Sequence, residues 1–209
     1  MKETLLIWGA SGHARVVADI VRLEGAYEIA GFIDDAPERA GVLGGREVLA
    51  DFRGAHLIVA FGDNEGRVAA ARFAIESGLH LATAIHPSAV VAASARIGAG
   101  TVVAANAVVN PGADVGENSI INTGATVDHD CVLGEGVHVS PGAHLAGGVR
   151  VGDCAWIGIG AAVADGRTIG RGAWIGAGAA VVADIPDDVV AYGVPARVVR
   201  SRAASSSHT

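Results

Sequence analysis

Residues 116–139 read GENSII NTGATV DHDCVL GEGVHV when they are divided into groups of six, and each group ends on an aliphatic residue. The same step of six continues without a slip from Val91 to Val181, across sixteen consecutive aliphatic positions. A helix requires apolar spacing near 3.6 and an ordinary strand near 2, whereas six is the period of hexapeptide β-helices. The pattern therefore predicts a β-helix. A low-complexity segment rich in Gly and Ala would not hold so strict an apolar period.

A second series lies two residues before each aliphatic position, and nearly all of its members are small, such as Ala125 and Cys131. We expect each hexapeptide to form one short strand and a corner, with the aliphatic side chain inside a triangular prism. Three hexapeptides complete a coil of 18 residues, and coils stack at the strand spacing of about 4.8 Å. Sixteen hexapeptides then give a little over five coils, roughly 25 Å tall. A narrow prism also explains a composition with 30 Gly and few aromatic residues.

Residues 4–84 lack the sixfold period and predict a small α/β unit of Rossmann type. We expect a strand at Thr4–Trp8, a Gly-rich turn at Gly9–Ala14 (GASGHA) and a helix at 16–23. A second strand at Ile29–Ile33 ends at Asp34 and Asp35, and a third strand at 56–61 precedes a second helix at 65–77. A helix N-terminus after such a turn suits a pyrophosphate, and carboxylates at a strand end suit a ribose or base. The turn matches G-x-G-x-x-G only in part, so a tight turn without a ligand is the alternative interpretation.

The sequence therefore divides into three segments. We expect an α/β domain at residues 1–84, a β-helix with a C-terminal tail at 85–200, and a disordered end at 201–209, which is small and polar.

Charge and cysteine content narrow the class of protein. The net charge of −7 argues against a nucleic-acid surface, which requires a basic face. No stretch has the length of a signal-peptide core or a membrane span, so we expect no membrane insertion. Cys131 and Cys154 are separated by a step that is not a whole number of coils, so they should not stack. We interpret them as free packing residues in a cytoplasmic protein.

One polar cluster exceeds what the corners of a β-helix need for solubility. His129 lies between Asp128 and Asp130, and a neighbouring carboxylate can orient an imidazole as a general base. Gly147 follows His129 by one full coil and should lie directly over it. His138 follows by half a coil and should face away on the same prism. The repeat therefore predicts a trimer in which His129 of one chain meets His138 of its neighbour.

The whole chain resembles the bacterial sugar O-acyltransferase family, which includes sialic-acid O-acetyltransferases and N-acetyltransferases of the UDP-bacillosamine and GDP-perosamine type. The matching segments are GASGHA at 9–14, Asp34–Asp35, GDNEGR at 62–67, IHPSA at 85–89, NTGATVDHDCVLGEGVHVSPGAHLAGG at 122–148 and GVPAR at 193–197. This resemblance implies a left-handed β-helix and acetyl-CoA as co-substrate. We expect a homotrimer from the repeat and no metal. The resemblance also implies that His129 is the general base, assisted by Asp130, where the family commonly has Glu. It places His138 in the acetyl-CoA site and the Gly147 amide on the thioester oxygen. It assigns the nucleotide of the sugar substrate to Gly9, Ser11, Gly12, His13, Asp34, Asp35, Gly62, Asn64 and Arg67.

The reaction that follows from the resemblance is direct transfer of an acetyl group to the 4-amino group of a nucleotide-linked deoxysugar. Cys131 occupies a small, inward-packing position and does not suit an acyl-enzyme intermediate. Acetylation of a hydroxyl on a sialic-acid-like sugar is the alternative. More distant alternatives are a zinc enzyme of the γ-carbonic-anhydrase type and a non-catalytic scaffold. The spacing of His129, His138 and His144 does not fit the former, and neither alternative explains the α/β unit.

Overall fold

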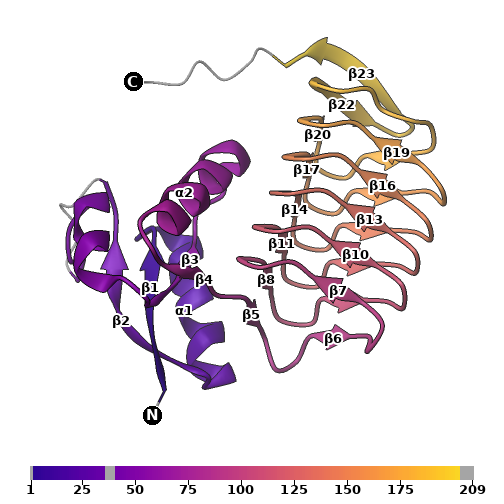
Figure 1. The fold of residues 1–209 in the computed structure, drawn as a ribbon. Helices are drawn as coiled ribbons and strands as arrows, with labels where there is room; N and C mark the ends of the chain where they lie inside the picture. The colour runs from indigo at the N-terminus through magenta and orange to yellow at the C-terminus, as the bar shows by residue number, and fades with distance from the viewer. Residues whose placement is uncertain (1, 36–40, 203–209) are drawn as a thin grey trace.

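The protein is described by a computed structural model that covers residues 2–35 and 41–202. An amino-terminal α/β domain is followed by a β-helix (Figure 1). The elements of the α/β domain are β1 (Glu3–Trp8), α1 (Gly12–Glu24), β2 (Tyr27–Ile33), the 3-10 helix η1 (Arg46–Phe52), β3 (His56–Val59), α2 (Asn64–Glu76) and β4 (His80–Leu81). They form a parallel sheet in the order β2-β1-β3-β4, which confirms the α/β prediction and adds β4 to it.

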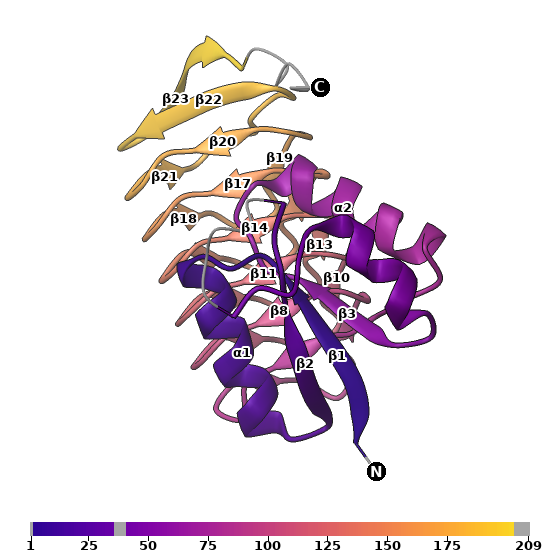
Figure 2. The ribbon, with the colours of Figure 1, turned by 90° about the vertical axis from the view of Figure 1, so that its left-hand side faces the viewer.

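Alternation of side chains along β1 gives this sheet two apolar faces. Leu5 and Ile7 pack with residues of α1, whereas Leu6 and Trp8 pack with residues of α2. The two helices therefore lie on opposite sides of the sheet (Figure 2). This arrangement leaves the carboxyl ends of β1 and β2, with the GASGHA turn, at one edge of the domain.

The β-helix is built from two-residue strands that recur every six residues. They are β5 (Ala84–Ile85), β6 (Val90–Val91), β7 (Arg96–Ile97), β8 (Val102–Val103), β9 (Val108–Val109), β10 (Asp114–Val115), β11 (Ile120–Ile121), β12 (Thr126–Val127), β13 (Val132–Leu133), β14 (His138–Val139), β15 (His144–Leu145), β16 (Arg150–Val151), β17 (Trp156–Ile157), β18 (Ala162–Val163), β19 (Thr168–Ile169), β20 (Trp174–Ile175) and β21 (Ala180–Val181). From β5 to β18, each strand pairs in parallel with the strand three positions later in the chain, as Ile120 of β11 does with His138 of β14. Three hexapeptides therefore complete a coil, as the sequence predicts. We call the sheets that begin with β5, β6 and β7 the first, second and third faces of the prism.

The interior and the corners of the prism obey the same period. The aliphatic positions from Val103 to Val181 are buried, while Val91 and Ile97 at the open end are partly buried. The small series is buried from Thr101 to Ala179, except at Arg167, and Ala89 and Ala95 are partly buried. A left-handed backbone recurs at the corners every six residues, at Gly124, Asp130 and Gly136 for example. Gly adopts this conformation without a steric cost, and Asn and Asp tolerate it, which explains the glycine content.

The coil that follows Val181 is shorter than the others. Ile169 pairs with Ile185 and Trp174 with Val190, so each partner arrives two residues earlier than the regular step would bring it. β22 (Val189–Gly193) thereby extends the first face, and β23 (Ala196–Ser201) pairs with it antiparallel. The regular sixfold repeat ends at Val181, as the sequence predicts, but the stack of coils continues beyond it.

The ordered tail also extends past residue 200, because Ser201 belongs to β23 and the Arg202 amide donates to Asp188 O at 2.6 Å. Of the predicted disordered end, residues 203–209 lie outside the described residues.

The two domains share part of one hydrophobic core. Val17, Ile20 and Val21 of α1 pack in one cluster with Val102 and Ala104 at the start of the first face. The chain therefore passes from β4 into β5 without a flexible linker, and the α/β domain covers the lower part of the first face (Figures 1 and 2). Within the described parts of the chain, no helix is long and apolar enough to span a membrane.

Candidate active site

His129 lies at the corner between β12 and β13, where the second and third faces meet. Its Nδ1 is 2.9 Å from Asp130 Oδ2, so the shorter aspartate side chain does reach the ring. Asp130 has a left-handed backbone (φ 58°), which places its carboxylate beside the preceding histidine. The Asp130 hydrogen bond, together with the charge of Asp128, raises the pKa of His129 above its usual value. Because the His129 side chain is 61% exposed, its other ring nitrogen is accessible to a substrate.

Gly147 lies over His129 as the repeat predicts. The Gly148 amide donates to His129 O at 2.9 Å, which places residue 147 one coil above the ring. A Cβ atom on Gly147 would lie 2.7 Å from both Cε1 and Nε2 of His129. Only glycine fits without displacing the imidazole, and its amide donates to no acceptor within residues 2–35 and 41–202.

His138 occupies a different environment on β14. The Asn122 side-chain amide donates to His138 Nε2 at 3.1 Å, so the ring is neutral and carries its proton on Nδ1. His138 Nδ1 is buried without a partner among the described residues. Burial, with smaller contributions from Arg67 and His13, lowers the pKa of His138 to about 3. Asn122 belongs to the polar cluster in the sequence, but no sequence signal singled it out as the partner of His138.

One chain does not bring His129 and His138 together. His138 is on the first face, and His129 is at the corner formed by the other two faces. In a triangular prism that corner lies across from the first face, in agreement with the sequence-based geometry. A site containing both residues must therefore draw on a second chain.

The GASGHA turn is held tightly at the carboxyl edge of the small sheet. Gly9 has φ 119°, and a Cβ there would lie 2.9 Å from Ala60 O, so the turn requires glycine. The Ala10 amide donates to Asp34 Oδ2 at 2.9 Å. His13, in the first turn of α1, is largely buried, and this burial lowers its pKa to about 4. Within this segment, Ser11 is the N-cap of α1 and Gly12 its first residue, so they lie at a helix start whose amides are available to an anion.

Asp35 is paired within the chain at the end of β2. Its carboxylate accepts from Arg46 Nη2 at 2.5 Å and from the Arg46 amide at 3.1 Å. The Arg46 guanidinium in turn lies over the rings of Trp8 and Phe73, at 5.9 and 5.6 Å. The hydrogen bond from Arg46 lowers the pKa of Asp35. The sequence did not indicate that Arg46 would lie beside Asp35 at this edge of the sheet.

Asn64 and Arg67 occupy the junction between the domains and present no open surface to a nucleotide. Arg67 is 1% exposed and Asn64 is 7% exposed. Their side chains bond backbone carbonyls of the β-helix at Asn118, Gly136 and Cys154. In this structure both side chains join the two domains, and the contact of Asn64 and Arg67 with a sugar nucleotide stays a prediction. Gly62 lies nearby with open space around its Cβ position.

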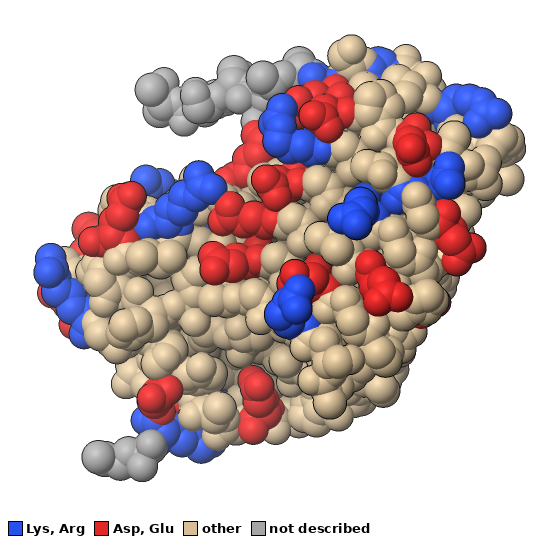
Figure 3. Space-filling view, turned by 45° about the vertical axis from the view of Figure 1, so that its right-hand side comes forward, with Lys and Arg blue, Asp and Glu red and all other residues tan. Residues whose placement is uncertain are grey.

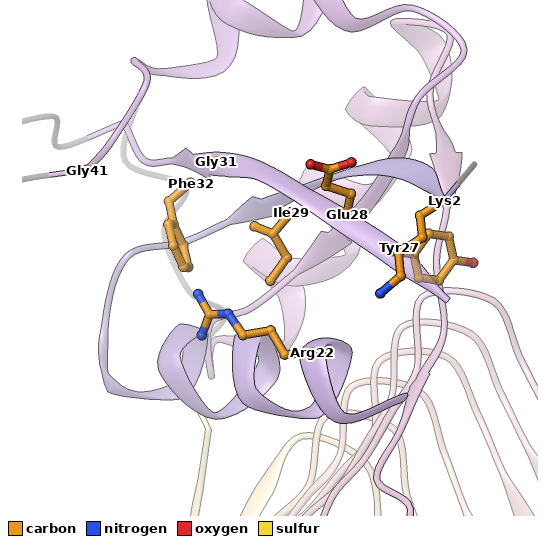
Figure 4. Close-up of a pocket in the computed structure, with 8 residues that line it drawn as sticks. All are labelled: Lys2, Arg22, Tyr27, Glu28, Ile29, Gly31, Phe32 and Gly41. Atoms are coloured by element: carbon orange, nitrogen blue, oxygen red, sulfur yellow. The ribbon is translucent and has the colours of Figure 1, made fainter. Parts of the chain in front are cut away.

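An open pocket of the α/β domain lies elsewhere. It runs along β2 and the last turns of α1, and Figure 4 shows Phe32 facing the Arg22 guanidinium, with Tyr27 and Lys2 at the other end. None of the predicted site residues lines it. Both cysteines are free. Among residues 2–35 and 41–202, no cluster of three or more His, Cys, Asp or Glu side chains could hold a metal ion.

These features define a hexapeptide β-helix protein with an appended α/β domain and a histidine at a glycine-covered corner. Residues 4–72 match the PglD N-terminal domain. Perosamine N-acetyltransferase from Caulobacter crescentus, solved with CoA and GDP-perosamine, is 43% identical (TM-score 0.91, covering 94% of this chain and 96% of that one). The acetyltransferase domain of PglB from Neisseria gonorrhoeae, solved with acetyl coenzyme A, is 41% identical (TM-score 0.90, 95% and 100% covered). WeeI from Acinetobacter baumannii is 25% identical (TM-score 0.85, 94% and 99% covered). No protein with a curated record matches significantly. The chain belongs to the family of PglD-like hexapeptide acetyltransferases.

Proposed function

We propose that this protein is an N-acetyltransferase that transfers the acetyl group of acetyl-CoA to the 4-amino group of a nucleotide-linked deoxysugar. The observation that carries this proposal is the corner at which His129, oriented by Asp130, lies beneath Gly147, whose amide has no acceptor among the described residues. The similarity to enzymes solved with CoA and GDP-perosamine supports both substrates. O-acetylation of a sialic-acid-like sugar is not favoured by any feature of the site.

The chemistry is general-base catalysis of direct acyl transfer. The bond between His129 Nδ1 and Asp130 leaves Nε2 to accept the proton of the attacking amine. The new bond joins the sugar nitrogen to the thioester carbonyl carbon and the carbon–sulfur bond breaks. The proton taken up by His129 Nε2 passes to the sulfur, and CoA leaves as the thiol. We assign the Gly147 amide to the oxygen on which negative charge develops, and one such donor contributes about 10²–10³ in rate.

His138 is the proposed contact for the acyl donor. Its Nδ1–H, which lacks a partner among the described residues, can donate to a thioester or amide oxygen, and Asn122 fixes the ring that carries it. Because His138 lies across the prism from His129, we propose a cyclic homotrimer of left-handed β-helices in which each site uses two chains. Acetyl-CoA and the sugar nucleotide would be the ligands of this cytoplasmic enzyme, which we propose to need no metal.

The nucleotide is proposed to bind at the carboxyl edge of the small sheet. Gly9, Ser11, Gly12 and His13 supply the turn and helix start for the diphosphate. Asp34 and Asp35 supply carboxylates for the ribose or base, with Gly62 leaving open space beside them.

The test is a reaction of the purified protein with acetyl-CoA and a panel of nucleotide-linked 4-amino sugars that includes GDP-perosamine. We expect release of free CoA thiol and a product that carries one acetyl group and resists hydroxylamine, as an amide does. A hydroxylamine-sensitive ester would establish O-acetylation instead. No thiol release with any member of the panel, from protein shown to be folded, would refute the proposal.

A further inference from the structure

The amino end of α2 is attached to one corner of the β-helix over consecutive coils. Asn118, Gly136 and Cys154 follow one another by one coil each, so they occupy equivalent positions at the corner between the third and first faces. Arg67 Nε donates to Asn118 O at 2.7 Å, and Arg67 Nη2 donates to Gly136 O at 2.8 Å. Asn64 Nδ2 continues the series by donating to Cys154 O at 3.0 Å. Two side chains thus bind three coils of the prism.

The Arg67 guanidinium does not face solvent, because the residue is almost completely buried. Its remaining bonds go to Phe61 O at 3.2 Å and Asn64 Oδ1 at 3.0 Å. All of these acceptors are neutral, and burial lowers the pKa of Arg67 to about 10. A planar fork with five donors can satisfy carbonyls on two coils at once, whereas a lysine ammonium cannot reproduce that geometry.

This attachment lies beside the residues proposed to hold the two substrates. Gly136, which Arg67 binds, is two residues before His138 on the same side of the prism. On the other side, Arg67 donates to Phe61 O, and a Cβ on Gly9 of the GASGHA turn would lie 3.4 Å from Phe61 Cδ1. Burial, with a smaller contribution from the Arg67 charge, lowers the pKa of both His13 and His138. His13 Nε2 and His138 Nδ1 both lack a partner among the described residues. The guanidinium therefore sits where the GASGHA helix start approaches the acyl-donor histidine.

Other charged side chains also lie at the junction of the two domains. Figure 3 shows acidic side chains gathered along the junction of the two domains. Arg72 and Glu135 pair across it near solvent, at 2.8 Å with Arg72 66% exposed, whereas Glu65 pairs with Arg202, which is 12% exposed. Exposed ion pairs contribute little to stability and hold no fixed geometry. The buried contacts of Arg67 and Asn64 join the domains close to His138, in addition to the shared apolar cluster of α1 with Val102 and Ala104.

We propose that Arg67 is a positioning residue for acetyl transfer, which sets the distance between the sugar-nucleotide turn and His138 without touching either substrate. This inference rests on the proposed function and departs from the family resemblance, which places the residue on the nucleotide. The bond-forming atoms come from ligands held by different domains. A shift of about 1 Å between them can cost about a hundredfold in rate.

The test separates binding from turnover. For Arg67→Met we expect the dissociation constants of GDP and of CoA, each measured alone by calorimetry, to stay within twofold of wild type with unchanged stoichiometry. We expect kcat to fall about a hundredfold, since each domain keeps its own ligand but loses its relative placement. Arg67→Lys should recover part of the loss. Arg72→Met, on the same helix and across the same junction, is the matched control and should leave kcat unchanged.

Arg67→Met also leaves buried carbonyls without donors, so it can fail to fold. Asn64→Ala then tests the same attachment from its upper end, with an expected loss of about tenfold in kcat at constant GDP and CoA affinity. A wild-type kcat in folded Arg67→Met or Asn64→Ala would overturn the inference. Weakened GDP binding in step with the lost turnover would overturn it as well, because Arg67 would then contact the nucleotide. If the wild type itself fails with every sugar nucleotide, the proposed function falls instead.

Discussion

Replacement of Gly147 by alanine tests the close packing of this residue against the ring of the proposed base. The new Cβ would lie 2.7 Å from Cε1 and Nε2 of His129, while ordinary contact begins at 3.4 Å. The ring must therefore move by about 0.7 Å (3.4 − 2.7). Gly147 does not have a left-handed backbone, so the substitution adds no backbone strain. Because His129 is an exposed side chain, the cost falls on its bond to Asp130 rather than on the fold.

We expect Gly147→Ala to lower kcat about tenfold to a hundredfold, since a displacement approaching 1 Å at a reacting group has that effect. The melting temperature and the affinity for GDP should stay close to wild type. The assay is steady-state release of CoA thiol at saturating substrates, with Ile159→Ala, at a different exposed corner, as the control. An unchanged kcat in Gly147→Ala would show that turnover does not depend on the position of the His129 ring, and would refute its role as the base.

Three further expectations follow from the same geometry. Asp130→Asn removes the main cause of the raised His129 pKa, so the acid limb of the pH–rate profile should move to lower pH while kcat falls. If the acid limb does not move, the group that titrates there is not His129. Mixed oligomers of His129→Ala and His138→Ala chains should regain activity that neither variant has alone, and inactive assemblies shown to be mixed would contradict the two-chain site. His13 and His138 have folded-state pKa values of about 4 and about 3, below the usual 6.5, so the unfolded chain takes up their protons first. The free energy of unfolding should therefore decrease as pH falls from about 6.5 to 4. Denaturant titrations that show no such decrease would contradict the burial of the two histidines.

Much of the site followed from arithmetic on the repeat. A period of six and a coil of three hexapeptides place Gly147 over His129 and separate His129 from His138, whatever the details of packing. The same arithmetic could not identify Asn122 as the partner of His138, because the two residues are less than one coil apart and meet only through their side chains. It also could not anticipate the shortened coil after Val181, where Ile185 and Val190 rejoin the stack without matching the sequence pattern.

The sequence by itself determined the β-helix, its core and its corner residues, because in a repeat each coil is specified by local periodicity and by contact with the next coil alone. It also determined the α/β character of the first domain, since apolar strands and Gly-rich turns are local signals. Only the tertiary structure decided how the domains join. The GDNEGR motif reads equally as ligand-binding or structural, and the buried bonds from Arg67 to Asn118 and Gly136 exist only once residues far apart in the chain are brought together. No local pattern encodes such long-range contacts with backbone carbonyls, because every residue carries the same carbonyl group.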